Sequence, residues 1–67
     1  MQLSKKKISR IIYLSVHKEE LNSMKKYQLL DELESYGITV DPYCDMDTES
    51  LRDIMHIVIR RVISKYL

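Results

Sequence analysis

The chain has one glycine, Gly37, and one proline, Pro42, and the two residues lie close together near its middle. Glycine and proline interrupt helices more strongly than other residues, so a break is expected between two helix-prone parts. Before the break, Leu29 and Leu33 share one helical face, and Gly37 stands where helices commonly end in the left-handed conformation. The pattern predicts a helix with Ser23 as its N-cap that ends at Gly37.

After the break, an apolar pattern begins at Asp47 or Thr48 and extends to the last residue. Acidic residues near its start and basic residues near its end suit the helix dipole, so a long helix is predicted. The face expected to cover the core carries Leu51, Ile54, Met55, Val58, Val62 and Tyr66.

The apolar arc of this long helix spans roughly 220°, at ~100° per residue, which is more than one small core needs. Two explanations stay open: other helices flank the long helix on both sides, or part of the arc is the interface of a homodimer. The residues assigned to that interface are Ile57, Ile59, Ile63 and Leu67.

The N-terminal part predicts a further helix, with Ser4 as N-cap and its end near Val16 or His17. The β-branched content of residues 10–16 also allows a strand, but their poor alternation favours the helix. Residues 17–22 form either a turn or a continuous link to the next helix. The predicted fold is therefore all-α: a single small domain over residues 1–67, in which three helices pack as a bundle around the long third one.

Size and cysteine content narrow the class of protein. A chain of 67 residues buries only roughly 60% of its unfolded surface, so a dimer would help its stability. The single cysteine, Cys44, excludes an internal disulfide and favours a cytoplasmic location. No apolar run approaches the ~18 residues that a membrane-spanning helix needs.

Charge is distributed in three blocks, although the whole chain carries only +1. Residues 1–22 carry a net +3, residues 23–50 a net −5, and residues 51–67 a net +3. This is not the chain-wide excess of a strong duplex-DNA binder. It permits head-to-tail self-attraction, or contact with an acidic partner through the basic ends.

The central acidic residues do not form a calcium loop. Asp45, Asp47 and Glu49 alternate as calcium ligands do, but an EF-hand requires glycine and glutamate where this chain has Ser50 and His56. Helix capping explains these acidic residues better.

Catalysis and cofactor binding are not expected either. His17, Cys44 and His56 lack the paired spacing of zinc ligands, and Cys44 has no evident histidine to activate it. A single glycine cannot build a phosphate-binding loop. The sequence therefore predicts a protein that is not an enzyme, with no cofactor and no metal.

The segment around the break resembles the helix–extended-loop–helix superfamily, which includes SAP and LEM domains. The spacing of Met24, Leu29, Leu33 and the pair Gly37-Ile38 is similar to that of the first SAP helix. The loop is longer than in SAP domains and fits LEM domains better. The residues that match the LEM pattern are Leu29, Leu33, Tyr36, Gly37, Ile38, Pro42, Thr48 and Leu51. Two positions depart from that pattern, Asp41 and Glu49, and the basic LEM ending is absent.

The resemblance implies DNA contact, as in SAP domains, or binding of a small DNA-bridging protein, as in LEM domains. The matching positions for DNA contact are Lys25, Lys26 and Arg52, although the acidic loop would repel phosphates. Tyr43, in the loop, is expected to be an exposed contact residue. The remaining tyrosines expected at the edge of the core, with hydroxyls in water, are Tyr27, Tyr36 and Tyr66.

The first functional hypothesis is a non-catalytic regulatory or adaptor module that binds nucleic acid or a nucleic-acid-associated protein. Its contact residues would be Lys25, Lys26, Tyr43 and Arg52. The alternative is a purely protein-binding module that homodimerises through its C-terminal helix and inhibits or bridges a partner protein.

Overall fold

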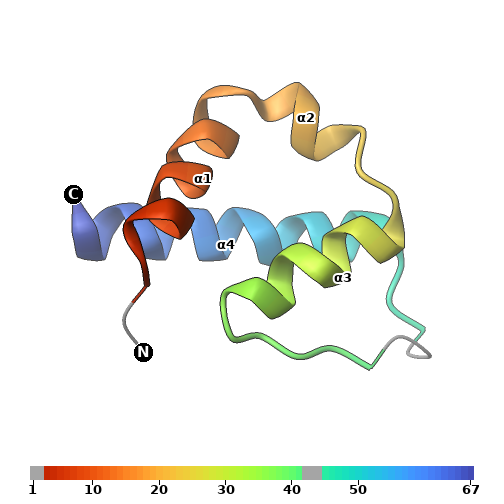
Figure 1. Ribbon diagram of the computed structural model, residues 1–67. Helices are drawn as coiled ribbons and strands as arrows, with labels where there is room; N and C mark the ends of the chain where they lie inside the picture. The colour runs from red at the N-terminus through yellow and green to blue at the C-terminus, as the bar shows by residue number, and fades with distance from the viewer. Residues whose placement is uncertain (1–2, 42–44) are drawn as a thin grey trace.

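The computed structural model describes residues 3–41 and 45–67, which form four α-helices (Figure 1). These are α1 (Lys5–Val16), α2 (Lys18–Asn22), α3 (Lys26–Ser35) and α4 (Thr48–Tyr66). The described ranges contain no strand, so the helical interpretation of residues 10–16 is confirmed. Within the described part, no helix is long and apolar enough to cross a membrane.

Helix α4 is the longest element, and the others are arranged around it (Figure 1). Helices α1 and α3 both contact α4, whereas α2 links the end of α1 to the start of α3. Helices α3 and α4 run in the same direction, so the chain after α3 returns along the molecule before α4 begins. Contact with both neighbours accounts for the buried part of the apolar arc of α4, whereas Leu67 in the same arc is 76% exposed.

The link between α1 and α3 differs from both sequence-based alternatives. His17 ends α1, and its N–H donates to the Tyr13 carbonyl at 2.9 Å. A separate short helix, α2, follows and places Leu21 in the core with no exposed surface. The prediction of three helices was therefore wrong. Burial of Leu21 stabilises a short helix, for which the residues around it give no signal in the sequence.

The start of α3 also differs from the prediction. Ser23 is the C-cap of α2, and its hydroxyl donates to the Glu20 carbonyl at 2.9 Å. The N-cap of α3 is Lys25, whose N–H donates to Oε1 of Gln28 at 2.8 Å. A capping serine suits either helix end through its hydroxyl, and here the preceding α2 uses it.

The end of α3 follows the prediction closely. Gly37 has a φ of 85°, in the region that side chains disfavour, and it directly follows the C-cap Tyr36. The N–H of Ile38 donates to the Leu33 carbonyl, and the N–H of Gly37 donates to the Glu34 carbonyl, both at 3.0 Å. These two bonds are those of a Schellman motif, so local chemistry ends α3 here.

Side chains cap α1 and α4 as the sequence indicates. Oγ of Ser4 accepts a hydrogen bond from the N–H of Lys7 at 3.3 Å. Oδ1 of Asp47 accepts one from the N–H of Ser50 at 2.8 Å. This bond lowers the pKa of Asp47 below its ordinary value of 3.8.

A lowered carboxyl pKa makes the stability of the fold depend on pH in the acid range. The contribution of the ionised Asp47 carboxylate to the free energy of unfolding is fully present above pH 3.8. It is lost as the pH falls through the pKa of Asp47 in the folded state. Between pH 7 and a pH of about 3, we expect the Asp47→Asn variant to lose less stability than the unmodified protein. Its amide oxygen still caps the helix but does not titrate. Urea unfolding at both pH values measures the loss of stability. The control is Asp53→Asn, which changes an exposed carboxylate of the same helix. Identical pH dependence in all three proteins would contradict the prediction.

One core joins all four helices. Its buried members are Ile11, Leu14, Leu21, Met24, Leu29, Leu33, Tyr36, Leu51, Met55, Val58 and Ile59. Ile59 is only 7% exposed, so it belongs to this core and not to a free surface. Tyr27, by contrast, is 63% exposed, so its predicted place at the edge of the core is wrong.

Candidate interaction surfaces

Three of the predicted contact residues lie at the end of the molecule where α3 and α4 begin. Nη2 of Arg52, on α4, donates to the carbonyl of Met24 at 3.4 Å. Because Met24 immediately precedes Lys25 and Lys26, this contact brings the three cations into one region. Tyr43 lies outside the described residues.

This region is not a purely basic surface. Asp47 caps α4 there, and the positive charge of Lys26 contributes to its lowered pKa. Exposed Glu49 and Asp53 follow in the first turns of α4. Nε of Arg52 is buried and has no hydrogen-bond partner among the described residues. Arg52 therefore links α4 to the connection between α2 and α3, and its guanidinium is less available to a ligand.

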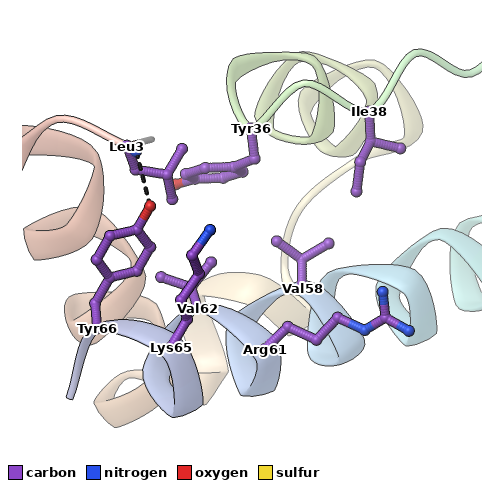
Figure 2. Close-up of a pocket in the computed structure, with 8 residues that line it drawn as sticks. All are labelled: Leu3, Tyr36, Ile38, Val58, Arg61, Val62, Lys65 and Tyr66. Atoms are coloured by element: carbon purple, nitrogen blue, oxygen red, sulfur yellow. Dashed lines mark hydrogen bonds between the residues drawn. The ribbon is translucent and has the colours of Figure 1, made fainter. Parts of the chain in front are cut away.

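The opposite end of the molecule joins the start of α1 to the end of α4. The N–H of Leu3 donates to the hydroxyl oxygen of Tyr66 at 3.0 Å, across 63 positions of sequence (Figure 2). All ten acidic residues of the chain lie between Glu19 and Asp53. The fold therefore brings together two segments that contain cations and no carboxylate side chains.

An apolar hollow of about 170 Å³ lies at this junction (Figure 2). Its lining residues come from the start of the chain, from the end of α3 and from α4: Leu3, Tyr36, Ile38, Val58, Arg61, Val62, Lys65 and Tyr66. In Figure 2 the Lys65 side chain rises from α4, whereas the Arg61 side chain extends along α4. Nζ of Lys65 lies 5.5 Å from the centre of the Tyr66 ring. The hollow thus combines apolar walls with two cations at its edge.

Further cations lie on the other side of Tyr36. A second depression next to Tyr36 is lined by Ser4, Lys6, Lys7, Arg10, Glu32 and Ser35. Tyr36 lines both this depression and the apolar hollow, so the two are adjacent. We call the combined surface, with Arg61 and Lys65 at the hollow and Lys6 and Lys7 in the neighbouring depression, the basic end.

A network of side chains holds Tyr36 in place between these two depressions. Oε1 of Glu32 accepts hydrogen bonds from Nη2 and Nε of Arg10 at 2.8 and 2.9 Å. Oε2 of Glu32 accepts one from the Tyr36 hydroxyl at 3.1 Å. Burial raises the pKa of Tyr36 well above its usual range, and the Glu32 carboxylate raises it further. Tyr36 therefore stays protonated and donates to Glu32 at neutral pH, and the network ties α1 to α3.

The four residues assigned to a dimer interface do not share one exposed surface. Ile57 is 49% exposed and Leu67 is 76% exposed, whereas Ile63 packs partly against the core. Ile59 is buried, so it is unavailable to a second copy of the folded chain. Dimerisation stays a prediction, and any interface on α4 would have to use the exposed residues.

The sequence contained the charges of the basic end, but gave no sign that they meet. The charge blocks show that both ends of the chain are basic. Their proximity depends on the Leu3–Tyr66 hydrogen bond and on the packing of α1 against α4. Within the described residues, no group of three or more histidine, cysteine or acidic side chains could hold a metal ion. No family model, curated protein or solved structure matches this chain.

Proposed function

We propose that this protein is a non-catalytic adaptor module that binds an acidic partner protein through the basic end. The observation that carries this proposal is the Leu3–Tyr66 hydrogen bond, which joins two carboxylate-free segments around an apolar hollow. Cations gathered on one face attract an acidic partner over a distance of about 10 Å at moderate ionic strength.

The walls of the hollow favour a protein over nucleic acid. Half of its lining residues are aliphatic: Leu3, Ile38, Val58 and Val62. Aliphatic side chains bind apolar groups and offer no hydrogen bonds to the polar edges of a nucleobase. Acidic protein segments, in contrast, carry carboxylates and apolar side chains close together, which suits the composition of the basic end.

Charge reversal at the basic end tests the proposal. The probe is a fluorescent peptide in which glutamates and aspartates surround one leucine, and its binding is followed by anisotropy. We expect the double variant Arg61→Glu with Lys65→Glu to bind it at least about tenfold more weakly, because two attractive contacts become repulsive. The double variant Lys18→Glu with Lys25→Glu has the same net charge and alters exposed lysines elsewhere.

The control variant is expected to stay within about twofold of the unmodified protein at moderate salt, where distant charges are screened. An equal loss in both double variants would show that only net charge matters, and would refute the proposed site. Failure of the unmodified protein to bind the peptide even at low salt would refute the proposed function.

A second candidate function is nucleic-acid binding at the starts of α3 and α4, which the SAP resemblance implies. The Arg52–Met24 contact favours it, because it brings Lys25, Lys26 and Arg52 together. Titration with duplex and single-stranded DNA at low and moderate salt tests it. Absence of binding at low salt would exclude it. Binding that survives Lys25→Ala with Lys26→Ala would place the nucleic acid on another surface.

A further inference from the structure

We infer that the apolar hollow of the basic end receives one bulky aliphatic or aromatic side chain from an acidic protein segment. Carboxylates next to that side chain in the partner would then lie against Arg61 and Lys65. The inference rests on the proposed function and adds the recognition element: an apolar anchor flanked by acidic residues.

The volume of the hollow suits one side chain. It measures about 170 Å³, and an apolar cavity of about 150 Å³ in another protein holds a benzene ring. A leucine or phenylalanine side chain is of this size, whereas a whole helix face is too large. One anchoring side chain is therefore the expected occupant.

The hollow is formed before any partner arrives. Val58 at its base is 7% exposed and belongs to the core. Hydrogen bonds hold two of its aromatic walls, since Tyr36 donates to Glu32 and Tyr66 accepts from Leu3. A preformed site loses less conformational freedom on binding, so more of the contact energy contributes to affinity.

Charge complementarity selects the chemistry of the partner. Arg61 and Lys65 contribute to the lining, and Figure 2 shows Lys65 rising from α4 and Arg61 extending along it. Their hydrocarbon stems extend the apolar wall, while their charged groups stay in water at the edge. A basic or neutral segment would leave this pair of cations without counter-charges. An acidic segment provides counter-charges on both sides of the anchor.

Two peptides that differ in one residue test the inference. Both have the same acidic sequence, one with a central leucine and the other with a central serine. We expect the leucine peptide to bind at least about tenfold more tightly, because it buries an apolar side chain that serine lacks. In the Val62→Phe variant, which fills the hollow, this advantage should disappear while the affinity for the serine peptide is retained.

Matched controls separate filling of the hollow from damage to the fold. Ile57→Phe adds the same ring to an exposed position of α4 and should preserve the advantage of leucine. Circular dichroism checks that both variants are folded. If Val62→Phe does not fold, methyl NMR of the unmodified protein replaces it. The leucine peptide should then shift the methyl resonances of Val58, Val62 and Ile38 and leave those of Ile57 unchanged.

The possible failures are distinguishable. Equal affinity for the two peptides, or methyl shifts at Ile57 alone, would overturn the inference and leave the proposed function standing. Binding of neither peptide would remove both. Salt-sensitive self-association that the leucine peptide does not displace would also overturn the inference, because the acidic middle of a second copy would then be the occupant.

Discussion

Replacing Leu33 with alanine is expected to lower the free energy of unfolding by about 3 kcal/mol. Leu33 has no exposed surface and belongs to the core that joins the four helices. The substitution removes buried methyl groups and leaves a cavity that the surrounding side chains fill only in part. A domain of 67 residues typically has a total stability of roughly 3–10 kcal/mol, so this variant should lose a large share of it.

Urea unfolding followed by circular dichroism measures this loss, and the chain offers a control with the same chemical change. Leu67→Ala alters a leucine that is 76% exposed at the end of α4. Its effect should stay within about 0.5 kcal/mol, as for other surface substitutions. Similar losses in the two variants would mean that Leu33 is not packed as described.

Removing the Glu32 carboxylate is expected to cost about 2 kcal/mol, because the partly buried Tyr36 hydroxyl and Arg10 lose their acceptor. Both oxygens of Glu32 are used, one by Arg10 and the other by Tyr36. The Arg10 side chain is 40% exposed, so water screens its ion pair and much of the effect should come from Tyr36. Urea unfolding of Glu32→Ala measures the loss.

The control for this variant is Glu34→Ala, which removes an exposed carboxylate from the same helix. A double-mutant cycle with Arg10→Ala gives the coupling between α1 and α3. We expect the double variant to lose less than the sum of the single losses, since both substitutions break the same contact. Strict additivity would show that the Arg10–Glu32 pair contributes no interaction energy.

Helix ends were predictable where a single residue supplies the chemistry of the end. Ser4 and Asp47 cap their helices through bonds to residues three positions later, and Gly37 adopts the left-handed conformation. Such interactions join near neighbours and depend little on the rest of the chain. Ser23 was assigned to the wrong helix, because the short α2 depends on burial of Leu21 in a core made by distant residues.

The candidate site was predictable only in its components. The sequence shows basic ends, an acidic middle and a tyrosine near the last residue. It does not show that the Tyr66 hydroxyl accepts a hydrogen bond from Leu3, or that Arg10 pairs with Glu32. Those contacts connect residues 63 and 22 positions apart, beyond the reach of helical periodicity.

Short-range chemistry was therefore sufficient to determine that the chain is helical, where three of its helices begin or end, and where its charges are concentrated. Hydrogen bonds and apolar repeats within a few residues carry that information. The tertiary packing decided which cations share a surface, and that Ile59 is buried while Ile57 faces solvent. It also created the hollow, because its walls come from three segments that meet only when α1 and α3 pack on α4.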